Sequence, residues 1–510
     1  MPVKTGKLSL ICELDNMINH FRPAFSRKKS FDNFSRIILG FILRDDIKGV
    51  TDFVRSGFDA DENPNAIYHR LDKFFRSSSY ELDNLRDLWG SFLATQCNDA
   101  TEIDGRRVLI GDGVKQGKSG RKMSGVKRYK QSSESMAKPN MIWGHLFGAI
   151  GLLTGDISGK MFCTPINADI EDGVHTIRKW ENKDYIKKSH VVQMVEQGIK
   201  VLRKTHHNYF YVLDRYFLSK EVINMIDKVN DMTKREDKSN NTMEIITKLR
   251  RNGIGYEAPS KVEGPRKRGR PRLKGASIKL YDLFDSEKKN FKEEEMFIYG
   301  KMQKVKYFVK DCLWGLGCYR KMRFVLVEMN GLRSILASSD LTVSANTTIY
   351  TYSSRWKCEE GFLRAKHVLG SMDYHFWTKS MPKLNHFRKS EDGNPVDLIK
   401  SPAEQQKIID ALRATEVYTF IGQVAQGMLQ LLSIKSRRLE LKTTKWLRTY
   451  SSNTNSEQTM AYDIKEIIKM GFYTSKDIRN PLKILKKASS RIFQPFYKSV
   501  KDYPLSFDPK

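Results

Sequence analysis

The chain has 510 residues, enough for a sizeable core and roughly two to four domains. Its 89 Lys and Arg outnumber 59 Asp and Glu, and the resulting charge of +30 favours a polyanionic partner such as nucleic acid. No apolar run approaches the ~18 residues of a membrane span, the N-terminus lacks the apolar core of a signal peptide, and the six cysteines lack zinc-like spacing. We therefore expect a cytoplasmic protein with reduced thiols and no membrane partner.

Residues 1–105 are predicted to be helical. Apolar residues recur at helical spacing in four stretches, which are 34–43, 50–58, 67–75 and 82–93. Asp-Glu-Asn-Pro at 61–64 is a plausible helix start. The two short helices before it suit either a helix-turn-helix that binds DNA or a plain helical cap on the next domain.

From residue 106 the pattern changes to short β-like runs separated by helical stretches. A run at 107–112 ends in Asp112, and a run at 209–213 is followed by Asp214. Between them lie β-like runs at 145–153 and 160–165 and a helical stretch at 189–202. Strands that alternate with helices in this way predict an α/β domain with a mixed sheet over 106–230.

Residues 231–340 begin as a polar, basic linker and become β-rich after about residue 277. This region is expected to end with the last strand of the core. Arg268-Gly-Arg-Pro271 matches the core of an AT-hook, in which Arg268 and Arg270 would enter a narrow A·T minor groove. A disordered basic linker with only non-specific DNA affinity is the alternative. Residues 341–372 and 373–510 are predicted to be mostly helical, with a lysine-rich end.

Four residues of the helix predicted after Ser344 fall on one stripe. Tyr352, Arg355, Glu359 and Lys366 are spaced by 3, 4 and 7 residues, which places them along one helix face. A carboxylate can hold a metal ion, cations can bind phosphate, and an aromatic ring can stack on a base. Glu360 points about 100° away from this stripe. The alternative is a partly exposed helix with solvated charges.

The loop after Asp112 contains four cations, Lys115, Lys118, Arg121 and Lys122, that can contact backbone phosphate. A solvated surface loop is an equal alternative. A nucleotide-binding P-loop is disfavoured, because Asp112 stands where its first glycine is needed.

Asp112 and Asp214 each lie just past a predicted strand, and Glu359 lies on a helix. Such an arrangement can bring three carboxylates to one point at the edge of a sheet. Crowded carboxylates need a compensating cation, and oxygen-only clusters suit Mg²⁺ or Mn²⁺. Two such ions about 3.5–4 Å apart can assist an in-line displacement at phosphorus.

These motifs together resemble the DDE transposases of bacterial insertion sequences, in the branch defined by a Tyr-Arg-Glu-Lys motif. The resemblance covers about 105–370. It is carried by the stripe and by the segments Ile110-Gly-Asp-Gly113, Val212-Leu-Asp-Arg-Tyr-Phe217 and Ile335-Leu-Ala-Ser-Ser-Asp-Leu341. It implies an RNase H-like catalytic core with a mixed sheet, interrupted by a β-rich insertion and flanked by N- and C-terminal helical regions.

The resemblance also implies roles for individual residues. Asp112, Asp214 and Glu359 would be the catalytic, metal-binding triad, and Tyr352, Arg355 and Lys366 would hold the transposon end. The protein would act near the bacterial nucleoid as a DNA-dependent homodimer on double-stranded transposon ends and target DNA, with contacts from the C-terminal helices. For a family tryptophan that stacks on a displaced base, Trp314 and Trp356 are candidates, although core packing suits both.

Two alternatives remain beside a transposase. One is another metal-dependent, RNase H-like DNA endonuclease that never joins ends. The other is a non-enzymatic DNA-binding protein derived from such a core, which the presence of all three acids disfavours.

Overall fold

The N-terminal residues fold into helices, as their apolar spacing predicts. The computed structural model describes residues 2–44, 47–55, 62–131, 140–157, 160–236, 241–260, 272–385, 394–441, 443 and 454–474. The first helices are α1 (Pro2–Asn19), α2 (Lys28–Leu43), α3 (Val50–Val54), α4 (Pro64–Arg76) and α5 (Leu82–Ser91). The predicted start of α4 is confirmed, because Pro64 is its first residue and the Asn63 side chain accepts a hydrogen bond from the Asn65 N–H.

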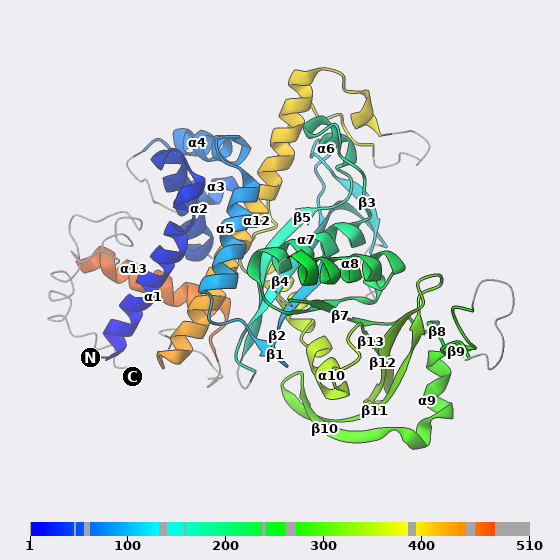
Figure 1. Ribbon diagram of the computed structural model, residues 1–510. Coiled ribbons are helices and arrows are strands. Elements are labelled where there is room, and N and C mark those ends of the chain that lie inside the picture. The colour runs from blue at the N-terminus through cyan, green and yellow to red at the C-terminus, as the bar shows by residue number, and fades with distance from the viewer. Residues whose placement is uncertain are drawn as a thin grey trace.

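A long C-terminal helix, α12 (Pro402–Arg438), lies between these helices and the sheet (Figure 1). Its side chains are buried almost without interruption from Ala411 to Ile434. It packs against α1, α2 and α4 on one side and the sheet on the other, and α13 (Glu457–Thr474) lies beside it. Most of α12 is therefore used inside its own chain, which leaves little of its surface for the expected dimer contacts.

Thirteen strands of the described residues form one mixed sheet, which confirms the predicted α/β class. In chain order they are β1 (Glu102–Ile103), β2 (Arg106–Gly117), β3 (Lys127–Lys130), β4 (Met141–Gly155), β5 (Met161–Ile170), β6 (Tyr209–Leu213), β7 (Met243–Lys248), β8 (Ile254–Tyr256), β9 (Ser277–Lys279), β10 (Lys292–Ile298), β11 (Lys301–Trp314), β12 (Arg320–Met329) and β13 (Leu332–Ser338). The main path runs β3-β4-β2-β6-β7-β13-β12-β11-β8-β9, with β5 beside β4.

The centre of the sheet is a parallel set. β2 pairs in parallel with β6, and β6 pairs in parallel with β7, while β4 is antiparallel to both β2 and β5. The sequence does not predict β7, because this short apolar run is embedded in a polar, basic stretch. It precedes the β-rich part, so the strand that completes the parallel set comes before that part and not after it.

The β-rich part continues the same sheet. β13 pairs with β7, and β10 to β13 follow as antiparallel hairpins. Helices α7 (His190–Thr205) and α8 (Lys220–Glu236) cover one face of the central strands, and α10 (Ala345–Ser353) lies against the other (Figure 1). Helix α11 (Trp356–His367) packs against β2 and β5. The short helices α6 (His175–Glu181) and α9 (Leu283–Ser286) lie outside these layers.

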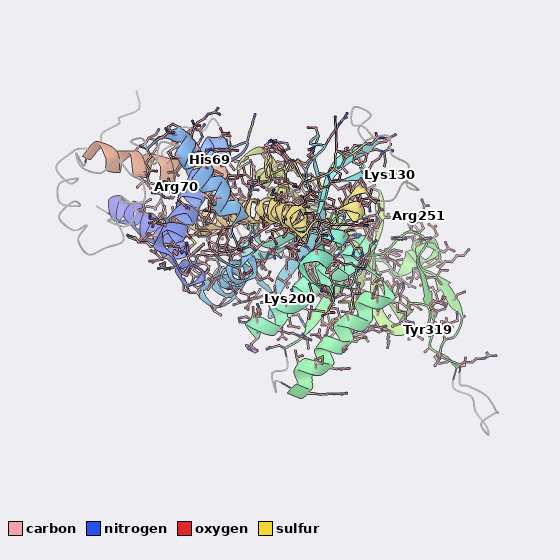
Figure 2. All side chains as sticks on the ribbon, turned by 90° about the horizontal axis from the view of Figure 1, so that it is seen from above. His69, Arg70, Lys130, Lys200, Arg251 and Tyr319 are labelled. Atoms are coloured by element: carbon pink, nitrogen blue, oxygen red, sulfur yellow. The ribbon has the colours of Figure 1, made fainter. Side chains whose placement is uncertain are left out.

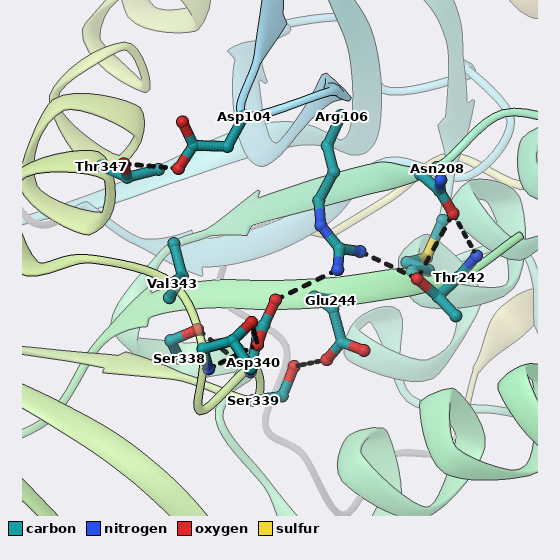
Figure 3. A network of polar contacts seen from close by, with 12 residues as sticks. Asp104, Arg106, Asn208, Thr242, Glu244, Ser338, Ser339, Asp340, Val343 and Thr347 are labelled. Atoms are coloured by element: carbon teal, nitrogen blue, oxygen red, sulfur yellow. Dashed lines mark hydrogen bonds and ion pairs between the residues drawn. The ribbon is translucent and has the colours of Figure 1, made fainter.

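A polar network ties the starting ends of the central strands to the segment that leads into α10 (Figure 3). The Arg106 guanidinium donates to Thr242 Oγ1 (2.8 Å) and lies 3.1 Å from the Asp340 carboxylate. The Ser339 hydroxyl donates to Glu244 (2.5 Å). These bonds fix where the chain leaves β13, and hence where α10 and α11 begin.

Basic side chains are spread over separate elements. Figure 2 labels Arg70 on α4, Lys130 on β3, Lys200 on α7 and Arg251 in the turn before β8. Among the described helices, none combines the length and apolar character that crossing a membrane requires.

Candidate active site

Asp112 and Asp214 lie side by side on neighbouring parallel strands. The register pairs Gly111 of β2 with Leu213 of β6, so the next residues, the two aspartates, are adjacent on strands about 4.8 Å apart. Asp214 follows β6 directly, as predicted. The prediction that Asp112 lies past the end of its strand is wrong, because β2 pairs with β4 as far as Gly117.

Arg355 joins Glu359 to these aspartates. Its Nη1 lies 2.7 Å from Asp112 Oδ2, and its Nη2 donates to Glu359 Oε1. The side chains of Arg355 and Asp112 are each 19% exposed, and that of Glu359 is 37% exposed, so the cluster opens to solvent on its Glu359 side. Glu360 faces away and pairs with Lys357 (3.1 Å), as the helical spacing predicts.

The predicted single helix through the stripe is interrupted. α10 ends at Ser353 and α11 begins at Trp356, so Tyr352 lies on one helix and Glu359 on the next. The Ser353 and Ser354 hydroxyls donate to carbonyls three residues earlier, at 2.7 and 2.6 Å. Such bonds compete with the helical ladder and favour a tight turn. This turn directs Arg355 toward β2.

The cluster shifts the pKa of its members. Burial raises the pKa of Asp112 to about 6, the Arg355 guanidinium and the Gly113 N–H oppose this change, and the charges of Asp214 and Glu359 add to it. Burial also opposes the charge of Arg355, yet the carboxylate of Asp112 and the neighbouring Glu359 raise its pKa above the usual value. Three acids and one arginine therefore form one electrostatic unit.

The donor chemistry of this unit suits a hard divalent cation, because all its acidic ligands are carboxylate oxygens. In the described part of the chain, however, no three His, Cys, Asp or Glu side chains are arranged to hold a metal ion. Arg355 stands between Asp112 and Glu359 and supplies the compensating positive charge. A cation would have to replace this guanidinium contact.

Tyr352 and Lys366, the other two residues of the stripe, have different surroundings near the acids. Tyr352 packs beside the buried Phe210 and Ile246, and burial raises the pKa of its hydroxyl to about 12. Lys366 lies near the end of α11, and its Nζ donates to the Lys115 carbonyl (2.8 Å). The stripe thus follows β2 from Asp112 toward the end of that strand.

The other predicted DNA contacts do not gather at the acids. Lys115 is three residues from Asp112 on β2, an odd number that places it on the opposite face, and its Nζ donates to the Lys130 carbonyl (2.7 Å). Lys118 is buried, and its Nζ donates to the Met372 and Tyr374 carbonyls. Its ammonium is occupied and does not reach solvent as a phosphate contact requires. Arg268 and Arg270 lie outside the described residues.

Tyr299 is a site residue that the sequence does not predict. It occupies the turn between β10 and β11 at φ +54°, is 57% exposed, and lies within electrostatic reach of Arg355 and Glu359. The signal is weak in the sequence, because only the Tyr-Gly pair of a tight hairpin marks it. Of the two predicted stacking candidates, Trp314 is partly buried against the core, whereas Trp356 is 56% exposed beside Arg355.

Comparison of the sequence with models of known protein families and with curated proteins found no match in either case.

Proposed function

We propose that the protein is a DNA transposase of the DDE type, which cleaves transposon ends and joins them to target DNA. The observation that carries the proposal is the convergence of Asp112, Asp214 and Glu359 around Arg355. They come from two neighbouring parallel strands and a helix far apart in sequence. Partly buried acids that repel one another are costly, and such groups cluster at functional sites.

The order of elements supports an RNase H-like core for this site. The first acid is on the long strand β2, the second follows the parallel strand β6, a β-rich part comes next, and the third acid is in the first turn of α11. This is the order that the resemblance implies. The described β-rich part extends the core sheet through β13 and brings Tyr299 to the acids, where its exposed ring can stack on a base.

The proposed cofactor is Mg²⁺ or Mn²⁺, held by Asp112, Asp214 and Glu359. Bound there, it would supply Lewis-acid activation of a phosphodiester. The chain's own residues act on the DNA: Arg355 and Lys366 bind phosphate oxygens, and Tyr352 and Tyr299 contact a base. The exposed face of α4, with Asn65, would contact the transposon end. We propose a DNA-dependent homodimer that holds two ends.

The test is cleavage and joining by purified protein on DNA that flanks its gene, with Mg²⁺ added. Asp112→Asn, Asp214→Asn and Glu359→Gln should each lower the cleavage rate by about 1,000-fold or more while DNA affinity stays within about threefold. Glu360→Gln is the matched control, since this neighbour pairs with Lys357. It should cleave like wild type.

Three results separate the candidate functions. Cleavage followed by joining of the 3′ end supports the transposase. Cleavage that never leads to joining, and that needs all three acids, indicates an endonuclease instead. Wild-type protein that binds DNA but never cleaves it with Mg²⁺ or Mn²⁺ contradicts both enzymatic functions.

A further inference from the structure

A cavity of about 560 Å³ lies beyond the end of β2, outside the acidic cluster. One wall is the segment 116–123 that leaves β2, and the other is the segment 373–383 that follows α11. The two walls are joined by backbone hydrogen bonds: the Leu384 N–H donates to the Arg121 carbonyl (2.8 Å), and the Thr378 N–H donates to the Lys122 carbonyl (3.4 Å). The cavity is thus built from two connected segments.

The wall after α11 exposes a tryptophan. Along this extended segment Tyr374 and Phe376 are buried in the core, while His375 and Trp377 between and after them are exposed. Trp377 is 53% exposed and is one of the lining residues. An extended chain alternates its side chains in this way, and the buried aromatics hold the exposed ones in place. Trp377 is therefore an aromatic surface on a fixed support.

A buried polar network connects the two walls. His145 Nε2 donates to the Ser124 carbonyl (2.8 Å), so His145 Nδ1 accepts from the Tyr374 hydroxyl (2.6 Å). The Lys118 ammonium lies 3.9 Å from the centre of the Tyr374 ring and donates to the carbonyls of Met372 and Tyr374. Both walls are thus fixed to each other through side chains, which explains why Lys118 is buried.

The cavity is cationic. Arg121, Lys122 and Lys383 line it together with a single carboxylate, that of Asp373, while the ammonium of the lining residue Lys118 is occupied by backbone carbonyls. Arg121 and Lys383 are exposed, and in the described residues neither forms an ion pair. An exposed ring among cations is the combination that binds single-stranded nucleic acid, because the ring stacks on a base while the cations bind phosphate.

The cavity also lies in line with the acids. Gln116, one of its lining residues, is four residues from Asp112 on β2, so the two share a face and lie about 13 Å apart along the strand. Lys366 of α11 contacts β2 between them, at the Lys115 carbonyl. A DNA strand bound at the acids can therefore pass Lys366 and reach the cavity within a few nucleotides.

We infer that this cavity is a binding site for one nucleotide of a single-stranded DNA segment, with the base on Trp377 and its phosphates on Arg121 and Lys383. This inference deepens the proposed function, because it names where the strand goes beyond the acids.

The test measures DNA affinity by fluorescence anisotropy in EDTA, so that no cleavage is needed. The probes are a blunt duplex and the same duplex with a single-stranded overhang of about six nucleotides on the 3′ or the 5′ strand. Wild type should prefer one overhang to the blunt duplex. Trp377→Ala should weaken overhang binding by about 5- to 100-fold and leave blunt-duplex binding nearly unchanged. Trp377→Phe, which keeps a ring, should restore most of the preference.

Cationic variants test the phosphate contacts. Lys383→Ala should weaken overhang binding severalfold, whereas Lys200→Ala on α7, across the sheet, should not change the preference. A light-activated crosslink from 5-iodouracil in the overhang should map to Trp377, which tests the site in unaltered protein.

Some results would overturn the site. One is wild-type protein that binds the overhang no better than the blunt duplex. The others are an unchanged overhang preference in Trp377→Ala and a crosslink that maps away from Trp377. Displacement of the overhang by equal concentrations of free dTMP would indicate a mononucleotide site instead. If the overhang preference depends on Trp377 but the protein never cleaves DNA, the nucleotide-binding site stands and the proposed transposase activity is refuted.

Discussion

Asp112, which is partly buried, and Glu171, which is buried, lie on opposite faces of the same sheet, and their surroundings differ. Asp112 faces α11 and contacts Arg355. Glu171 follows β5 and lies over Gly148 of β4, on the face covered by α7. Its two carboxylate oxygens are buried and, among the described residues, have no hydrogen-bond partner.

The pKa values show what this difference means. Burial, with a smaller contribution from Asp169, raises the pKa of Glu171 to about 9, so this acid is protonated at neutral pH. The Arg355 guanidinium opposes the same effect at Asp112, whose pKa is about 6, so that acid is mostly ionised. An acid binds a cation most readily when it is ionised, and of these two acids Asp112 meets that condition at neutral pH.

The largest effect that bears on this contrast is expected from Arg355→Ala. Without the guanidinium, the pKa of Asp112 should rise and its carboxylate should resemble that of Glu171. We expect DNA cleavage at pH 7 to fall by about 100-fold or more, and partial recovery as the pH is raised toward 9. Arg355→Lys keeps the positive charge and should lower the cleavage rate less than Arg355→Ala does. A rate that is unchanged at pH 7 would contradict this role of Arg355.

A smaller effect is expected from Glu171→Gln. The pKa of Glu171 is raised from 4.5 to about 9 by folding, so its contribution to stability is complete below pH 4.5 and is lost progressively as the pH rises to about 9. Glutamine cannot ionise, so the variant should not lose stability in this way as the pH rises. The variant should melt about 2–4 °C higher than wild type at pH 8 and at nearly the same temperature at pH 5. A lower melting temperature at pH 8 would show that the ionised carboxylate has a partner.

The sequence predicts the parts of the site that depend on local pattern. The strand at 209–213 ends just before Asp214, and the stripe separates Glu359 from Glu360, because strand and helix periods are local properties. The sequence does not predict that β2 continues beyond Asp112. The residues after Asp112 are mostly polar, and they are extended because they pair with β4. The break at Ser354 depends on hydroxyl contacts, and the place of Tyr299 depends on how a distant hairpin folds back.

The burial of Lys118 likewise depends on residues distant in the sequence. A lysine in a Gly- and Lys-rich loop has the local pattern of a phosphate contact. Its burial depends on Met372 and Tyr374, more than 250 residues away in sequence. Conversely, Trp377 has no motif around it, and only the fold places it next to Arg121 and in line with Asp112.

If Asp112, Asp214 and Glu359 together bind a divalent cation, as we propose, Mn²⁺ binding should depend on all three acids. Electron paramagnetic resonance of free Mn²⁺ gives the bound fraction in the presence of protein and DNA. Wild type should bind Mn²⁺, and Asp112→Asn should weaken this binding by at least about tenfold. Glu171→Gln, which alters the buried acid on the opposite face of the sheet, should bind like wild type. Equal Mn²⁺ binding by wild type and Asp112→Asn, or no binding by wild type, would refute a metal site at these three acids.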